Sequence, residues 1–212
     1  MYWLPVGSWE PHGAHLPEDT DTRIASRLAQ AAAAPADVVL PAIGFGCSFE
    51  HRRLGRLISL RVATFAALLT DIVRAVPDPL VVVNAHGGNT PLDALAQEWA
   101  ADGRSVLVLP TRAQWAAAYA AAGWDFGPHD DMHAGAMERS LLLHWEPEVV
   151  GTPAPADHAV PDRPLFTARG MAGYAPTGII GYPQVASAEA GRRAAAALVA
   201  ALRETVAAWC HG

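Results

Sequence analysis

Acidic and histidine side chains gather in three short stretches of this sequence, each next to an apolar run. The first stretch, 7–21, follows the apolar run Tyr2–Val6 and holds four carboxylates and two imidazoles. Glu10 and His12 are two residues apart, so they point to the same side of an extended chain. Imidazole beside carboxylate oxygens suits zinc, iron or manganese better than calcium or magnesium. The alternative is a polar surface loop in which Asp21 caps a helix.

The second stretch, Asn84–Thr90, also follows an apolar run and precedes a helical pattern. Its paired glycines let the backbone approach a ligand closely, but the pattern matches neither G-x-x-x-x-G-K-S/T nor G-x-G-x-x-G. His86 at the end of a strand therefore favours a metal over a nucleotide. A tight turn with a hydrogen-bonded histidine is the structural alternative.

The third stretch, His129–Ser140, leads into the apolar run 141–143. A helix that begins near Gly135 would place Glu138 in its first turns, where the side chain can reach inward. His133 would then lie just before the helix and face a substrate. Taken alone, Glu138 fits a first-turn carboxylate stabilised by the helix dipole. Three such stretches in one short chain favour a metal site.

Nucleophilic catalysis is the rival chemistry, for which the available side chains are Ser8, Cys47 and Ser48. None lies in a G-x-S-x-G turn, and nothing marks a nucleophile with its own base and orienting group. The only cysteines, Cys47 and Cys210, are too few for a disulfide framework and lack C-x-x-C spacing.

Elements that could position these side chains follow from the apolar patterns. Four apolar runs predict strands buried on both faces: Tyr2–Val6, Val38–Ile43, Leu80–Asn84 and Ser105–Leu109. Helical patterns occupy Arg61–Val76, Leu92–Asp102, Thr111–Ala122 and, after a cap at Ser187, Ala190–Trp209. Alternating strands and helices predict a three-layer α/β/α fold with a largely parallel central sheet. The Pro-, Gly- and Ala-rich segment 151–176 is predicted to be a long surface or interface loop.

Composition narrows the functional class. The net charge is -6, from 21 acidic and 15 basic residues without a basic run, which argues against binding to nucleic acid or an anionic membrane surface. The N-terminus has no cationic segment before an apolar stretch, and no later apolar stretch is long enough to cross a bilayer. We therefore expect a cytoplasmic protein whose 212 residues, 51% of them hydrophobic, form one domain.

The three stretches together resemble the creatininase family of metal-dependent amidohydrolases. The family patterns are approximately P-V-G-S-x-E-Q-H-G-P-H-L-P-x-x-T-D-T, N-x-H-G-G-N and H-A-G-x-x-E-T-S, and this chain matches them in order and spacing. Residues 41–51 and 176–181 further resemble the branch of the family that belongs to the mycofactocin system. Pro11, Ala14 and Arg139 depart from the family pattern, but none of them is a ligand position.

The resemblance implies one creatininase-like metallohydrolase domain over residues 1–212 and a set of metal ligands. These would bind two divalent metal ions, zinc, iron or manganese, and are Glu10, His12, Asp21, His86 and Glu138. Asp21 would bridge the two metals, and His133 would act as a proton-transfer group. Some creatininases carry a glutamate ligand where this chain has Gly88, so the second metal would depend on Glu138.

The resemblance also implies an activity and an assembly. The mycofactocin branch implies a peptidase that removes the C-terminal Val-Tyr dipeptide from a modified precursor peptide. A hydrolase of a creatinine-like cyclic amide or a formamide is the first alternative, and a non-catalytic binding protein on the same fold is the second. By resemblance we expect a homohexamer.

Overall fold

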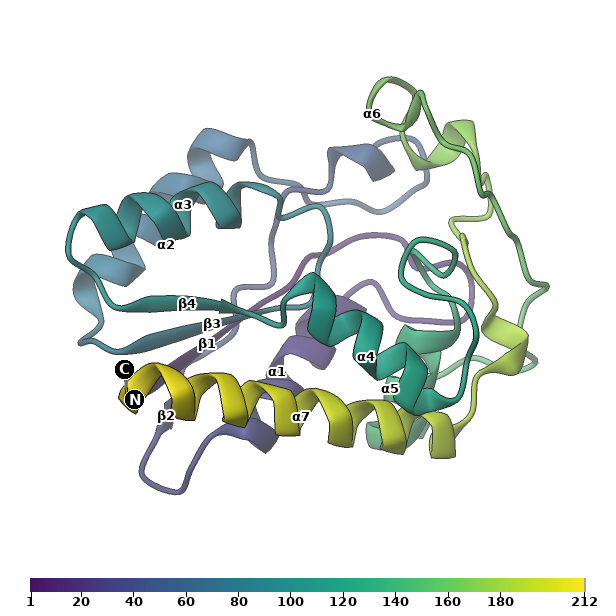
Figure 1. Cartoon of the computed structure of the whole chain (residues 1–212). Helices are drawn as coiled ribbons and strands as arrows, with labels where there is room; N and C mark the ends of the chain where they lie inside the picture. The colour runs from purple at the N-terminus through teal and green to yellow at the C-terminus, as the bar shows by residue number, and fades with distance from the viewer. Residues whose placement is uncertain (212) are drawn as a thin grey trace.

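The computed structural model describes residues 1–211 and is built on a sheet of four parallel strands (Figure 1). The strands are β1 (Tyr2–Val6), β2 (Val38–Val39), β3 (Leu80–Asn84) and β4 (Val106–Leu109), in the order β2-β1-β3-β4. β1 lies against β3 along its whole length, from Tyr2 beside Leu80 to Val6 beside Asn84. The expected α/β fold with a parallel central sheet is confirmed.

Helices cover both faces of this sheet (Figure 1). On one face lie α2 (Val62–Ala75) and α3 (Pro91–Ala101). On the other lie α1 (Thr20–Ala32), α4 (Arg112–Ala122), α5 (Ala136–Trp145) and α7 (Ala188–His211). α6 (Phe166–Arg169) is a helix of a single turn, and it does not pack against the sheet. Among the described residues, no helix has the length and apolar character needed to cross a membrane.

The side chains of β3 explain why its sequence is a continuous apolar run. Leu80 and Val82 belong to the core formed with α2 and α3, whereas Val81 and Val83 belong to the core on the opposite face. All four are fully buried. Successive residues of a strand point to opposite faces, so a strand between two helical layers needs apolar residues at every position.

Two segments differ from the sequence expectation. β2 ends at Val39, although Leu40 and Ile43 still donate backbone hydrogen bonds to Trp3 and Pro5. Leu40 and Ile43 are three residues apart whereas their acceptors are two apart, so the regular ladder is broken there. The segment 151–176 is mostly irregular, as predicted, but it does not lie only on the surface. Its residues Met171 and Ala175 are fully buried, because they pack into a small apolar cluster of their own.

Candidate metal centre

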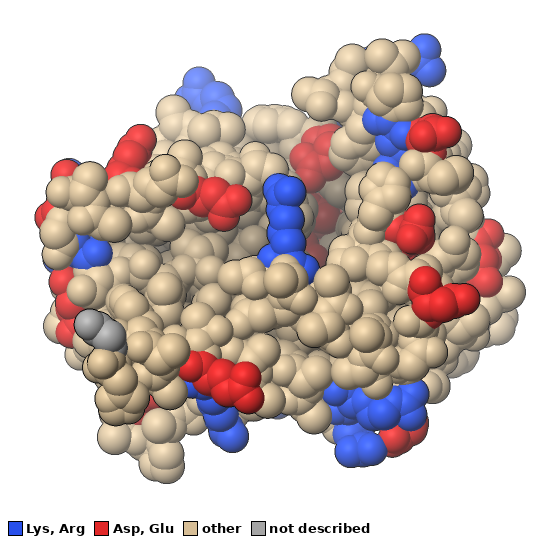
Figure 2. All heavy atoms as spheres, in the orientation of Figure 1, with Lys and Arg blue, Asp and Glu red and all other residues tan. Residues whose placement is uncertain are grey.

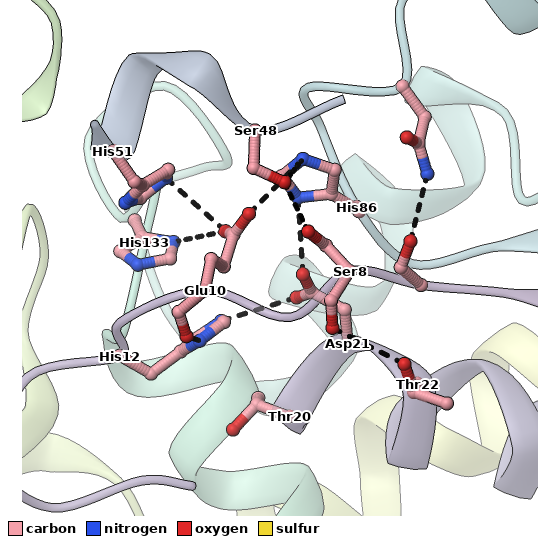
Figure 3. Close-up of polar contacts among 12 residues, drawn as sticks. Ser8, Glu10, His12, Thr20, Asp21, Thr22, Ser48, His51, His86 and His133 are labelled. Carbon is pink, nitrogen blue, oxygen red and sulfur yellow. Dashed lines mark hydrogen bonds and ion pairs between the residues drawn. The ribbon is translucent and has the colours of Figure 1, made fainter. Parts of the chain in front are cut away.

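The six side chains expected to form the site come together at the carboxyl end of the sheet, and five of them are labelled in Figure 3. Glu10 and His12 lie in the loop after β1, and His86 lies in the loop after β3. Asp21 is the second residue of α1, whereas Glu138 is the third residue of α5. Because β1 and β3 are parallel neighbours, the loops that follow them meet at one edge, where sites of open α/β sheets form.

One candidate ligand group consists of Glu10, Asp21 and His86, whose ligand atoms lie within 4.8 Å of one another. His86 Nε2 is 3.3 Å from Glu10 Oε2, and its Nδ1 is 3.1 Å from Asp21 Oδ2. Asp21 therefore contacts His86 and not the start of its own helix, so the alternative of a helix-capping Asp21 is wrong.

The second oxygen of Asp21 faces a second group. His12 Nε2 lies 3.2 Å from Asp21 Oδ1 and 3.8 Å from Glu138 Oε2. The backbone holds both partners, because His12 Nδ1 is bonded to the Glu10 carbonyl at 3.0 Å and Ala134 N–H donates to Glu138 Oε2 at 2.6 Å. Asp21 thus presents one carboxylate oxygen to His86 and the other to His12, as a bridging ligand would. His12 and Glu138 also form a group of metal-ligand spacing with His133.

Burial of these groups provides a test of whether they fit a metal. Glu10, His12, Asp21 and His86 are at most 4% exposed. Imidazole nitrogens lie 3.1 to 3.3 Å from both oxygens of Glu10 and from Asp21 Oδ2, but among the described residues none of these contacts has the geometry of a hydrogen bond. Buried carboxylates without partners cost several kcal/mol unless positive charge compensates them. The nitrogen and oxygen donors present are those of zinc, iron and manganese sites, so the residue set fits divalent metals.

Electrostatics lead to the same conclusion. Burial alone would lower the pKa of His12, but the Asp21 carboxylate raises it to about 10. The pKa of His86 is likewise raised well above its usual range, against the effect of burial, by Glu10 and Asp21. Burial raises the pKa of Glu138 to about 8. The buried carboxylates therefore stabilise positive charge next to them. A divalent metal would supply that charge and would displace the protons from the imidazoles.

His133 faces the same cluster from the loop before α5. Its Nε2 is 2.8 Å from the Pro11 carbonyl oxygen, which can only accept, so Nε2 carries the proton. Its Nδ1 is 3.6 Å from Glu10 Oε1 and therefore presents a lone pair to the site. Burial, with the charges of His12 and His51, holds the pKa of His133 well below its usual range.

Sequence reasoning missed His51, which lies in a 3₁₀ turn (Phe49–His51). Its Nε2 is 3.3 Å from Glu10 Oε1, and its ring centroid is 4.4 Å from that of His133. Glu10, His51 and His133 form a further group with metal-ligand spacing. The only signal in the sequence was a histidine at the end of the stretch 41–51, outside the three polar stretches.

Asp131 holds the loop that carries His133 and Glu138. Its buried carboxylate accepts hydrogen bonds from the N–H groups of Ala136, Met137 and Tyr182 at 2.7 to 2.9 Å. It also accepts from the hydroxyl of Tyr119 at 3.0 Å. A side chain at Gly135 or Gly181 would collide with this carboxylate, which accounts for both glycines. Asp131 is thus a positioning residue rather than a ligand.

Other polar residues of the first stretch lie away from the cluster. Asp19 pairs with Arg23 Nε at 2.7 Å within α1, and His15 is buried without a hydrogen-bond partner among residues 1–211. Gly88 cannot carry a ligand side chain here, because a Cβ would collide with His86 and Glu50.

A serine nucleophile is not presented by this site. Ser48 Oγ is 3.4 Å from His86 Nε2, and His86 contacts Asp21, which superficially gives a Ser-His-Asp order. However, Ser48 is fully buried against Ser8, and neither serine lines the cleft described below. His86 Nε2 is also closer to the Cys47 carbonyl oxygen, at 3.0 Å. Cys47 and Cys210 are both free thiols.

A cleft of about 760 Å³ opens over the cluster, and Figure 2 shows the hollow with acidic side chains inside it. Five of the six expected side chains line it: Glu10, Asp21, His86, His133 and Glu138. Residues 49–52 and 163–171 contribute to its walls, including Phe49 and Phe166. A side pocket of about 510 Å³ shares His86, Glu138 and Met132 with the cleft and extends towards β4 and α4.

Comparison with known proteins gives relatives over the whole chain. Residues 1–206 match the family model described as creatininase, creatinine amidohydrolase. The mycofactocin precursor peptide peptidase of Mycobacterium ulcerans (strain Agy99) is 35% identical over 230 residues, covering 99% of this chain and 85% of the relative. The protein of that name from Mycolicibacterium smegmatis (strain ATCC 700084 / mc(2)155) is 34% identical over 229 residues, with the same coverage.

Solved structures give the same fold. A putative creatinine amidohydrolase from Bacteroides fragilis NCTC 9343 superposes with a TM-score of 0.76 at 25% identity, covering 100% of this chain and 90% of the other. A creatinine amidohydrolase (creatininase) superposes with a TM-score of 0.77 at 23% identity, covering 97% and 88%. A structure described as "Creatininase Mn" has a TM-score of 0.73 at 24% identity, covering 97% and 89%.

Proposed function

The chain belongs to the creatininase (creatinine amidohydrolase) family, and we propose that it is a two-metal peptidase that releases the C-terminal Val-Tyr dipeptide from the modified mycofactocin precursor peptide. The observation that carries the proposal is the buried cluster of carboxylates and imidazoles at the base of an open cleft. Relatives named for this peptidase are about 35% identical over nearly the whole chain, whereas the creatininase structures are 22 to 25% identical.

Two metals are proposed because Asp21 offers one oxygen to each of two ligand groups. Glu10, Asp21 and His86 would hold the first metal, and His12, Asp21 and Glu138 the second. Creatininases described with manganese or as a Zn-Zn type share this fold, which supports a divalent pair without fixing its identity. When bound, such a pair activates a water molecule at neutral pH and polarises the scissile carbonyl.

The residues of the chain supply the remaining chemistry. His133 Nδ1 faces the cluster with its lone pair, because Nε2 is tied to Pro11. We assign to this nitrogen the proton that the attacking water loses, and its transfer to the leaving amide nitrogen. The N–H groups of Ala136 and Met137 donate to the Asp131 carboxylate, which positions the loop that carries His133.

The cleft suits a peptide better than a small cyclic amide. Its volume of about 760 Å³ lies in the range that accommodates ligands much larger than creatinine. A peptide can also use contacts remote from the scissile bond, and such binding energy can raise turnover only for the substrate that supplies it.

Mass spectrometry of parallel reactions tests the proposal. The metal-loaded protein should release Val-Tyr from the modified precursor and leave creatinine essentially untouched, whereas Asp21→Asn should release nothing. Truncating the precursor from its N-terminus should lower kcat/KM before cleavage stops. If the precursor stays intact and creatinine is hydrolysed, the substrate assignment is wrong and the protein is a creatinine hydrolase. Tight binding of the precursor without any release would identify a binding protein.

A further inference from the structure

A guanidinium stands where the cleft and the side pocket join. Three arginines line the cleft, and two of them are held by backbone carbonyls. Arg52 donates to Phe49 and Ala168 at 3.1 and 2.9 Å, and Arg163 donates to His129 O at 2.8 Å. The third, Arg112, lines both cavities and has no hydrogen bond or ion pair within residues 1–211.

The backbone of Arg112 is held by the start of α4, whereas its guanidinium has no polar partner within residues 1–211. Arg112 is the first residue of α4, and Thr111 closes the helix start by a reciprocal capping box with Gln114. Gln114 Nε2 also donates to Ala201 O and Thr205 Oγ1, which ties this helix start to α7. The guanidinium of Arg112 therefore lines the cavity from a helix start whose backbone is held in place.

The side pocket beyond Arg112 combines an apolar wall with polar side chains that include Asn84, Asn89 and Asp131. It extends from Glu138 and His86 to the aromatic rings of Trp115 and Tyr119, and Leu92, Val108 and Met137 also line it. Asp93 is a further carboxylate in the lining, and among the described residues it forms no ion pair with Arg112. Such a pocket can receive an aromatic or large aliphatic side chain within reach of the metal cluster.

We propose that Arg112 binds the C-terminal carboxylate of the peptide substrate, and that the side pocket receives the side chain of the C-terminal residue. This inference rests on the proposed peptidase function and adds the basis of its specificity. In a substrate cleaved two residues from its end, the carboxylate lies about 7 Å beyond the scissile carbonyl. A long arginine beside the cluster can reach that position, and its fork can bind both oxygens. The substrate class is thus peptides with a free carboxylate after a bulky terminal residue.

The test compares peptides that end in a free carboxylate with matched carboxamides. Wild-type protein should cleave the free acid on the order of 10-fold to 100-fold more efficiently, mainly through KM. Arg112→Gln should lose that preference, cleaving the free acid as poorly as the amide and the amide as well as wild type does. Arg112→Lys should recover part of the preference because it restores the charge without the fork.

A matched control is Arg61→Gln, because Arg61 is also exposed at the start of a helix but lines neither cavity. It should cleave both peptides as wild type does, and all variants should keep the wild-type metal content. If Arg112→Gln still discriminates acid from amide as wild type does, the inference is wrong and the peptidase function stands.

A binding measurement tests the role of Arg112 independently of catalysis. Calorimetric titration of the metal-loaded protein with Val-Tyr and with Val-Tyr amide needs no turnover. Wild type should bind the free dipeptide on the order of 10-fold more tightly, and Arg112→Gln should bind both equally. Equal binding by wild type would overturn the role of Arg112. Absence of precursor cleavage alongside the expected binding difference would overturn only the peptidase function.

Discussion

His133 has its two ring nitrogens in different surroundings, and this decides how its role can be tested. Nε2 donates to Pro11 O, whereas Nδ1 faces the cluster. His133→Ala should therefore keep its metals but lose turnover on the order of 10²-fold, the contribution typical of general acid-base groups. Elemental analysis and kcat from the same preparation check this. Parallel loss of metal and activity would show instead that His133 is a ligand.

The candidate site could be predicted from sequence only where its residues lie in short motifs. Glu10 and His12 share a loop, His86 precedes a pair of glycines and Glu138 follows Gly135, so local patterns in the sequence identify them. Whether they bind metals stays a prediction. His51 and Arg112 lack such a pattern, because only tertiary packing places them beside the cluster.

At the scale of elements, α1 and α5 carry Asp21 and Glu138, and a charged group links the two helices. Glu146 follows α5 and pairs with Arg23 and with Arg27 Nε, the latter at 2.7 Å. Burial alone would raise the pKa of Glu146, but the bonds from the two arginines hold it below its usual range. The folded state therefore favours the ionised carboxylate.

Replacing Glu146 should expose this contribution and its pH dependence. Glu146→Gln should lower the free energy of unfolding by about 1 kcal/mol at pH 7, a modest value because both arginines are partly exposed. Since the folded pKa is depressed, the difference should persist above about pH 4.3 and vanish as the pH falls through the folded pKa. Denaturant unfolding at several pH values measures it. The nearby exposed Glu148→Gln should show no difference, and a pH-independent loss would refute the electrostatic account.

Regular elements were largely predictable, because their patterns are local. The apolar runs gave β1 and β3 with the observed boundaries, and Ser187 does cap α7 by accepting from Ala190 N–H. β2 was overestimated, because the spacing of its donors changes between Leu40 and Ile43 and breaks the regular ladder with β1, which the apolar run does not reveal. The burial of Met171 within the segment 151–176 could not be predicted, because that segment has no periodicity and packs against residues far away in the sequence.

At the scale of the whole molecule, the cleft combines parts of the chain that are far apart in sequence. Residues from the segments 49–52, 86–90, 128–133 and 163–171 line it. No sequence pattern predicts that these segments meet around one cleft, because their meeting depends on how the loops pack over the sheet. The homohexamer and the single domain over 1–212, both expected at the outset, stay predictions. A cleft lined by side chains from separate loops explains why the cluster is buried yet faces a cavity that can admit a substrate.

Two metals that share Asp21 are the central feature of the proposed active site. Anomalous X-ray diffraction from crystals of the metal-loaded protein, collected at the metal edge, locates them directly. We expect two peaks about 3.5 to 4 Å apart, one beside Glu10 and His86 and one beside His12 and Glu138. Asp21→Ala should lose both peaks, and Glu138→Ala mainly the second. A single peak in active wild-type protein, or one held by His51 and His133 without Asp21, would contradict the bridged centre.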